Sequence, residues 1–239
     1  MPYYYYGFDW TYIFIVLPCF ILAMVASSRV NSTFRKYAKQ LSSRHITGQE
    51  AAQRVLRANG ISNVTISRVK GNLTDHYDPK TNTIRLSEAV FDSTSTAAIG
   101  VACHEAGHAV QYAQSYFPIK IRSAIIPITN FGSKLAMPLI LLGILLGAFG
   151  NYSFTFVYLG ISCFALSLVF QLVTLPVEFN ASRRAMETIE QTGMLTEEEQ
   201  RGAKKTLTAA AMTYVAAVAV SAAQLLRLIL LFGGRRRNN

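Results

Sequence analysis

Three long apolar stretches divide the sequence into segments. No Asp, Glu, Lys or Arg occurs in residues 10–28, 135–177 and 206–226. About 20 apolar residues let a helix cross the hydrocarbon core of a bilayer, so the middle stretch is long enough to cross twice, with a short outer turn that begins at Asn151. A soluble protein rarely contains three such stretches. The pattern predicts a polytopic membrane protein whose first three spans cover residues 11–26, 135–150 and 154–175.

The last apolar stretch, residues 207–232, is harder to place in the membrane. It is long enough to span, yet three arginines follow it at 235–237, and a fourth crossing would put them outside, against the positive-inside trend. Arg227 also lies within this stretch, where an ionisable group is costly unless it pairs or reaches the interface. One solution is that residues 209–223 pack on the soluble part and only the rest inserts. We predict a fourth membrane-associated helix and leave its crossing open.

Two helices are predicted in the soluble segment that follows the first span. Thr47 and Glu50 form a T-x-x-E capping box, and Gly60 can end the helix that they open. A second helix is predicted over residues 94–115, because residues 92–95 offer N-cap oxygens and small apolar side chains follow.

Two strands are predicted between these helices. Residues 63–70 alternate between polar and apolar positions, and residues 83–87 follow the polar stretch 71–82. The edge of a sheet can bind an extended peptide as an added strand, and residues 83–87 lie just before the second helix. The sequence leaves two alternatives open, a peptide-binding edge strand and a plain two-stranded sheet that covers the helix.

These elements predict a mainly α-helical membrane protein with a small β-hairpin or sheet and three to four transmembrane helices. A second charged, helical segment is expected at 178–205, with a break at Gly193 and a helix cap at Thr196. The predicted organisation is an N-terminal transmembrane anchor, a soluble segment, a transmembrane hairpin, a second soluble segment, and a C-terminal membrane-associated helix with a basic tail: 1–26, 27–134, 135–176, 177–206 and 207–239.

Charge sets the expected orientation of the chain. The chain is 51% hydrophobic and 15% charged, with a net charge of +10. Asp9 precedes the first span, whereas five basic residues follow it between Arg29 and Arg44, so the N-terminus is expected outside and the next segment in the cytoplasm. Tyr3 to Tyr6 are typical of an aromatic belt at a membrane interface. No basic stripe interleaved with aromatic residues accompanies the charge, which argues against nucleic-acid binding.

The predicted helix 94–115 contains the motif that carries the chemistry. His104, Glu105 and His108 form an H-E-x-x-H pattern. Residues four apart lie on one face of a helix, so both imidazoles can reach one metal ion, and Glu105 can take a proton from metal-bound water. The alternative is two histidines that are merely satisfied core residues, which the helical context disfavours. The three cysteines follow no C-x-x-C spacing, so no disulfide framework is indicated.

A catalytic zinc site needs a third protein ligand. The remaining histidines are His45, in a basic linker typical of a solvated residue, and His76. His76 is a candidate to polarise a carbonyl or bind substrate, although a loop histidine bonded to backbone is the favoured interpretation. Among the acids, Glu178 follows Pro176, where a helix could begin at the membrane face. It is either a ligand or an ordinary acid at a helix N-terminus.

A family resemblance decides between these candidates. The motif around His104, the upstream Leu-Thr-Asp-His-Tyr-Asp-Pro and the downstream Leu-Pro-Val-Glu-Phe-Asn-Ala-Ser-Arg-Arg-Ala resemble the bacterial membrane zinc metallopeptidases of the gluzincin type. The resemblance covers nearly the whole chain. It implies a zincin-like helical catalytic domain in which His104, His108 and Glu178 hold one Zn²⁺ per chain and Glu105 is the general base.

A more distant resemblance is to the CAAX prenyl proteases and stress-linked membrane zinc proteases. These carry a Glu-x-x-x-Asp pattern after their membrane hairpin, and Ser182 occupies the Asp position here. The Asp of those relatives would orient a metal histidine, a role that Asn180 or Ser182 could fill more weakly. Arg183 is a candidate to stabilise the oxyanion or to anchor the chain at the membrane face.

The expected function is hydrolysis of peptide bonds in membrane or membrane-proximal proteins at the cytoplasmic face of the plasma membrane. One rival is a zinc-binding but proteolytically silent scaffold, against which the Glu of the motif argues, because a structural site needs no general base. Another is a transport component, which the scarcity of polar residues in the spans disfavours. The sequence names neither the substrate nor the oligomeric state, and another divalent metal would suit the same ligands.

Overall fold

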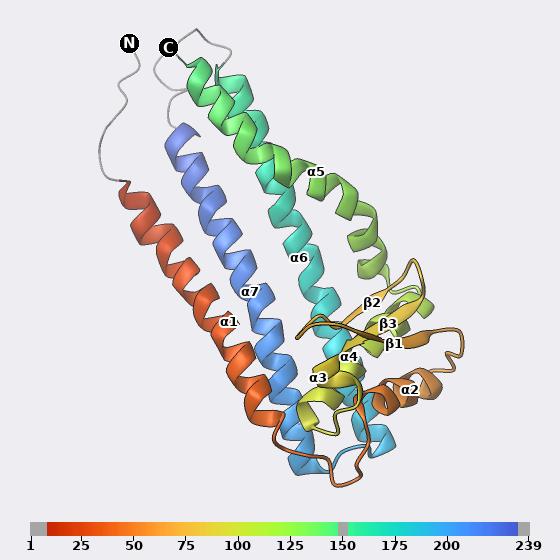
Figure 1. Cartoon of the computed structure of the whole chain (residues 1–239). Helices are drawn as coiled ribbons and strands as arrows, with labels where there is room; N and C mark the ends of the chain where they lie inside the picture. The colour runs from red at the N-terminus through yellow and green to blue at the C-terminus, as the bar shows by residue number, and fades with distance from the viewer. Residues whose placement is uncertain (1–8, 148–152, 234–239) are drawn as a thin grey trace. The chain divides into compact units, whose positions relative to one another are not determined.

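The structure, a computed structural model, describes residues 9–147 and 153–233 (Figure 1). The described residues form a mainly helical membrane protein with a small sheet, as predicted, and they divide into two compact units. Unit 1 comprises residues 1–25, 121–174 and 214–239, and unit 2 comprises residues 26–120 and 175–213. The predicted aromatic belt at Tyr3 to Tyr6, the turn that begins at Asn151 and the arginines at 235–237 lie outside the described residues.

Helix α2 (Gly48–Ala58) begins and ends in unit 2 where the sequence predicts. The Thr47 side chain accepts from the Glu50 amide, and the Glu50 carboxylate accepts from the Thr47 amide, so the capping box is present. Gly60 has a φ of 69° and follows the last turn directly, a conformation that glycine adopts at little cost. Ala51, Ala52, Val55 and Leu56 are fully buried against the rest of unit 2.

The sheet of unit 2 has three strands rather than the predicted two. β1 (Thr65–Val69) pairs in parallel with β3 (Thr83–Ser87), and β2 (His76–Asp78) pairs antiparallel with β3. The strand order β1-β3-β2 makes β3 the central strand. Of the two alternatives left open for residues 83–87, the peptide-binding edge is therefore excluded, because β2, a strand too short to show a period-two pattern, covers that edge. The plain two-stranded sheet is also incomplete, since it lacks this third strand.

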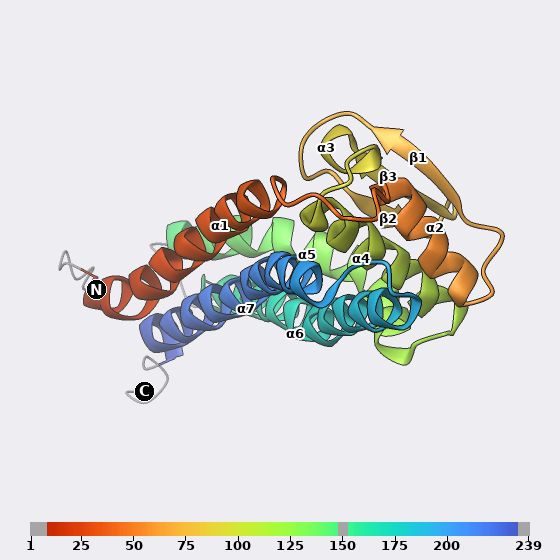
Figure 2. The ribbon, with the colours of Figure 1, turned by 90° about the horizontal axis from the view of Figure 1, so that it is seen from below.

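Helix α4 (Thr96–Ala113) is at the centre of unit 2 and follows the short helix α3 (Glu88–Phe91). The Ser95 hydroxyl caps it by accepting from the Ala98 amide, so α4 begins within the predicted range. It packs against α2, α3, β2 and β3, and Figure 2 shows α2 and the sheet beside it. Its small side chains are buried in the core of this unit, which lets the neighbouring elements approach closely.

Two long helices also contribute to unit 2. α6 (Ser153–Thr192) continues through Pro176 without interruption, so the prediction that a helix begins near Glu178 was wrong. Pro176 removes only one hydrogen bond from a helix whose other turns are intact. α6 ends before Gly193, as predicted, and α7 (Glu197–Gly233) starts with a capping box between Thr196 and Glu199.

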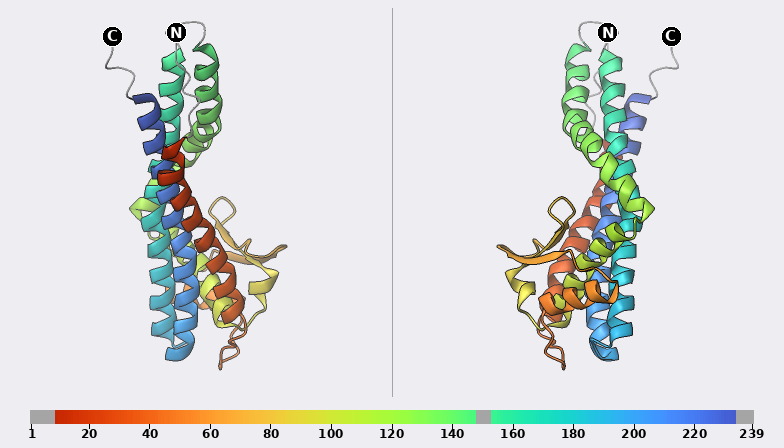
Figure 3. Two further views of the ribbon diagram at one scale, coloured as in Figure 1. Left: turned by 90° about the vertical axis from the view of Figure 1, so that its left-hand side faces the viewer. Right: turned by 90° about the vertical axis from the view of Figure 1, so that its right-hand side faces the viewer.

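Unit 1 contains the apolar parts of four helices. α1 (Leu17–Tyr37), which follows a π-helical turn at Tyr12–Val16, α5 (Phe117–Leu146), α6 and α7 are each long and apolar enough to cross a membrane. α5 contains Pro127 and Pro138 and bends along its length (Figure 1). Within unit 1, α5 and α6 lie side by side (Figure 3), and a Cβ added to Gly160 would lie 2.7 Å from the Ala136 carbonyl oxygen.

Two polar pairs of unit 1 join residues that are far apart in the sequence. Arg227, in the ambiguous last apolar stretch, donates to Asp9 with its Nε 2.8 Å from the carboxylate, and its guanidinium lies 5.3 Å from the Tyr12 ring centre. Gln171 donates to the Ser221 hydroxyl at 2.8 Å. The cost expected for an arginine in this stretch is thus reduced by pairing.

Candidate metal centre

Two imidazoles meet on one face of α4. His104 and His108 are one helical turn apart, and their ring centres lie 4.7 Å from each other. His108 is 8% exposed. The Ser95 cap and the packing of small residues fix this helix, so the position of both rings follows from the local sequence.

The third member of the cluster comes from α6. Oε2 of Glu178 lies 3.3 Å from Nε2 of His104 and 3.6 Å from Nε2 of His108. Two ligands that are each about 2.0–2.2 Å from a tetrahedral zinc ion lie about 3.3–3.6 Å apart. The donor set, two imidazole nitrogens and a carboxylate oxygen, and its spacing therefore fit a zinc ion with one position left open.

Gly107 makes the approach of α6 to α4 possible. A Cβ at this position would lie 2.7 Å from the Ala181 carbonyl oxygen, closer than real Cβ contacts allow. Because that atom belongs to backbone, a larger residue would have to push the two helices apart. The glycine inside the H-E-x-x-H motif thus lets Glu178 reach the imidazoles.

The other nitrogen of each imidazole has its own partner. Nδ1 of His104 lies 3.0 Å from the Ser182 hydroxyl, and Nδ1 of His108 lies 3.0 Å from Oε1 of Gln111. Since an amide oxygen only accepts, Nδ1 of His108 carries the proton and Nε2 is free to bind a metal. Ser182 is the residue that the sequence placed at the Asp position of distant relatives, and it contacts a metal-site histidine.

Gln111 is the centre of a buried network that sequence reasoning missed. It is fully buried, and its Nε2 donates to the Val177 carbonyl at 2.8 Å and to Oδ1 of Asn180 at 2.9 Å. Arg184 donates to the same Asn180 oxygen at 2.7 Å and also to the side chain of Gln114. The network ties α4 to α6. A signal was available, because Gln111 follows His108 by three residues and so lies on the same helix face.

Glu105 lies beside the cluster and is held by the edge strand. Its Oε2 accepts from the Tyr77 amide in β2 at 3.0 Å, and the residue is 9% exposed. Its pKa is raised to about 7, chiefly by burial. The charges of Glu178 and Asp75 act in the same direction, whereas His104 and the Tyr77 amide oppose the rise. A buried carboxylate with a raised pKa is suited to accept and return a proton near neutral pH.

Asp75 anchors the chain that enters β2, and this residue was also missed. Its carboxylate accepts from the amide and the hydroxyl of Ser87, at 2.7 and 3.0 Å. Burial raises its pKa, although the bonds from Ser87 oppose that effect. Asp75 thus fixes the start of the strand that carries Tyr77 to Glu105.

Two of the predicted residues lie apart from the cluster. His76 is exposed and its Nδ1 lies 2.8 Å from the Thr74 carbonyl, the expected backbone bond, but it begins a strand rather than lying in a loop. The Arg183 side chain is 66% exposed, and its Nε lies 3.9 Å from the Glu187 carboxylate. The partners of these two side chains, the Thr74 carbonyl and Glu187, are not among the three metal-ligand candidates. Asn180 is linked to His108 by Gln111, whose side chain forms hydrogen bonds with both residues.

A helical membrane fold with this donor set is typical of membrane zinc peptidases. Comparison with known families agrees, because residues 12–233 match the family described as "Putative neutral zinc metallopeptidase". The chain belongs to that family. The comparison with curated proteins gives the "Putative membrane protease YugP" of Bacillus subtilis (strain 168), which is 44% identical over 191 residues, covering 80% of this chain and 83% of the relative. No solved structure matches the chain.

Proposed function

We propose that this protein is a zinc-dependent endopeptidase that hydrolyses peptide bonds in membrane or membrane-proximal proteins. The observation that carries the proposal is the meeting of His104, His108 and Glu178 at zinc-ligand spacing beside the buried carboxylate of Glu105. The family and the similar membrane protease support the same class of activity. One zinc ion per chain would satisfy this donor set.

Each residue of the cluster has a definite task in this proposal. His104, His108 and Glu178 hold the ion, while Ser182 and Gln111 fix the orientation of the two imidazoles. A bound zinc ion supplies Lewis-acid chemistry, because it acidifies a water molecule and polarises a carbonyl group. Glu105 accepts the proton of the attacking water and returns it to the leaving amine.

The edge strand β2 gives a route for the substrate. The Tyr77 amide donates to Glu105 rather than to β3, so it points out of the free edge of the sheet toward the site. An extended peptide can add to that edge as a further strand and bring its scissile carbonyl to the cluster. Strand addition, one of the alternatives for residues 83–87, is therefore proposed for residues 76–78 instead.

The location of the substrate follows from the spans. In the described part of the chain, four helices are long and apolar enough to cross a membrane, and the segment between the first two carries the motif. The basic residues after the first span support a location of that segment on the cytoplasmic side of the plasma membrane, in line with the positive-inside trend. Substrates would therefore be membrane proteins, their cytoplasmic tails or damaged chains at that surface.

The test compares four proteins in detergent: wild type, Glu105→Gln, Glu178→Ala and the control Glu187→Gln. Glu187 is on the same helix as Glu178, but its side chain is 52% exposed and pairs with Arg183. Zinc per chain is counted by elemental mass spectrometry, and cleavage of casein or of the chain itself is followed. We expect one zinc in wild type, Glu105→Gln and the control, loss of zinc in Glu178→Ala, and cleavage only by wild type and the control.

The Glu105→Gln variant should lose activity by roughly 10²–10⁴-fold while keeping its metal, because an amide cannot accept the proton. If all four proteins retained zinc and none of them cleaved a substrate, Glu178 would not be a zinc ligand. The protein would then be better described as a zinc-binding but proteolytically silent scaffold. Cleavage by Glu105→Gln at the wild-type rate would exclude Glu105 as the base.

A further inference from the structure

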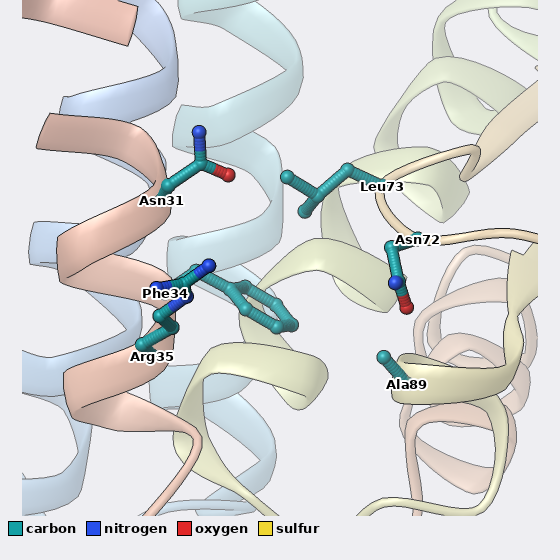
Figure 4. A pocket seen from close by; sticks show the side chains of 6 residues that line it. All are labelled: Asn31, Phe34, Arg35, Asn72, Leu73 and Ala89. Carbon is teal, nitrogen blue, oxygen red and sulfur yellow. The ribbon is translucent and has the colours of Figure 1, made fainter. Parts of the chain in front are cut away.

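A groove of about 310 Å³ in unit 2 lies apart from the metal-ligand cluster (Figure 4). It lies between the end of α1, the loop that joins β1 to β2, and the start of α3. Figure 4 shows the Phe34 ring and the Leu73 side chain extending into the same space from opposite sides. The residues that line it are Asn31, Phe34, Arg35, Asn72, Leu73 and Ala89.

The polar lining of the groove suits an anion. Arg35 offers a guanidinium group, and in the described part of the chain no carboxylate lies within 4.0 Å of it. Asn72 adds an amide donor, whereas Nδ2 of Asn31 donates to the Ser27 carbonyl at 3.4 Å, and none of the six lining residues is acidic. A second hollow shares Phe34 and Arg35 and is lined further by Lys36 and Lys39, so the surroundings are also positive.

The apolar lining of the groove suits a lipid rather than a free anion. Leu73 is 44% exposed and has a φ of 56°, a left-handed conformation that bulky residues rarely adopt. The loop thus holds an apolar side chain over the groove at a conformational cost. Together with Phe34 it forms a surface that glycerol and the first acyl carbons could contact, next to the cationic end of the groove.

The position of the groove along α1 agrees with the headgroup layer of a bilayer. The charge-free stretch of α1 ends at Ser28, and Asn31 and Arg35 follow it by three and seven residues. At 1.5 Å per residue these side chains begin about 5–10 Å beyond the apolar stretch. The headgroup region on each side of the hydrocarbon core is about as thick. The distance of these side chains from the apolar stretch is the same for either orientation of the chain in the membrane.

We propose that this groove binds the headgroup of an anionic phospholipid. Arg35 pairs with the phosphate, the amide of Asn72 donates to its oxygens, and Phe34 and Leu73 contact the apolar part of the molecule. The site does not depend on the proposed peptidase activity, because none of its residues belongs to the metal-ligand cluster or to the network around it.

The test measures lipid retention by the full chain in detergent. Phosphatidylglycerol and phosphatidylcholine are added at equal concentrations, and bound lipids are counted by native mass spectrometry. The variants are Arg35→Gln and the matched control Arg29→Gln, which removes an exposed cation from the same helix outside the groove. We expect wild type and Arg29→Gln to retain phosphatidylglycerol in preference to phosphatidylcholine. Arg35→Gln should retain roughly fivefold less phosphatidylglycerol.

A second variant and a competitor keep the test decisive. Leu73→Asp leaves Arg35 in place but puts an anion over the groove, so it should also lower phosphatidylglycerol retention. Inorganic phosphate at 10 mM, roughly a physiological excess, should not displace the lipid, because it lacks the apolar contacts. Equal losses in Arg35→Gln and Arg29→Gln, no preference for phosphatidylglycerol, or displacement by phosphate would each overturn the assignment. Zinc content and the melting temperature of each variant report whether it is folded.

Discussion

The polar side chains of the two units are organised differently. In unit 2, Gln111 contacts His108 and Asn180, and Asn180 contacts Arg184, so one connected network runs from the imidazole to the surface of α6. In unit 1, Gln171 pairs with Ser221, and Arg227 pairs with Asp9. Among the described residues, no hydrogen bond or ion pair joins these two pairs to each other.

This difference reflects what each set of polar groups achieves. A separate pair within apolar helices gives a partner to individual polar groups, such as the Gln171 amide nitrogen and the Arg227 guanidinium, without linking them to further side chains. A connected network additionally fixes the orientation of its members, because each group restricts the next. The predictions below test whether only the network of unit 2 controls a metal site.

Removal of the metal should have the largest effect, and it should be confined to unit 2. Treatment with 1,10-phenanthroline should lower proteolysis to background, and added zinc should restore it, because the proposed chemistry depends on the ion. Hydrogen exchange followed by mass spectrometry should increase in α4 and in residues 175–192 of α6. Exchange in the unit 1 part of α6 should not change, and an equal rise there would contradict the comparison.

Gln111→Leu should lower zinc affinity by roughly 10–100-fold, since it removes the group that orients His108 and leaves Asn180 without that donor. Titration against a competing chelator measures the affinity. The matched control in unit 1 is Gln171→Leu, which removes a glutamine from a separate pair and should leave zinc affinity unchanged. The same loss in both variants would mean that general destabilisation, rather than orientation, explains the result.

Ser182→Ala should have a smaller effect than Gln111→Leu. It removes one hydroxyl contact to His104, so zinc affinity should fall by about tenfold or less. Ser182→Asp puts a carboxylate at the same position and should raise the affinity above that of Ser182→Ala, because a charged acceptor holds the imidazole proton more strongly. The chelator titration would refute this if the alanine and aspartate variants bound zinc equally.

The pair of Arg227 and Asp9 should contribute least. Their side chains are 21% and 31% exposed, and polar pairs between membrane helices contribute about 0.6 kcal/mol on average. Unfolding of wild type, Arg227→Gln, Asp9→Asn and the double variant in mixed detergent gives their coupling energy. Zinc content should not change in any of the four. A coupling above about 2 kcal/mol would show that this pair behaves as part of a larger network.

How much of the fold follows from the sequence depends on how local each signal is. The capping box of Thr47 and Glu50 and the cap at Ser95 involve residues three apart, and both helices begin where predicted. Strand β2 has only three residues, so it showed no pattern before its pairing with β3 was known. Pro176 indicated a helix start, but in a long apolar helix the neighbouring turns compensate for the lost hydrogen bond.

The same limit applies to the site. The H-E-x-x-H pattern places His104 and His108 because both are on one helix, whereas Glu178 was selected by a family resemblance. Two partners of Gln111, Val177 and Asn180, lie 66 and 69 residues away, and the Gln114 partner of Arg184 lies 70 residues away, so no local pattern reveals these three contacts. From the sequence we selected Arg183 and overlooked Arg184. The two side chains point in directions about 100° apart on the helix, and that of Arg184 donates to Asn180.

The separation of the proposed zinc ligands along the chain has a consequence for biosynthesis. His104 and His108 precede α5, whereas Glu178 follows α5 and the apolar first part of α6. Because translation proceeds from the N-terminus, a nascent chain carries both histidines well before it carries the glutamate. The proposed site is therefore incomplete until two membrane helices have been made. An unfinished chain could not cleave its neighbours at the insertion machinery.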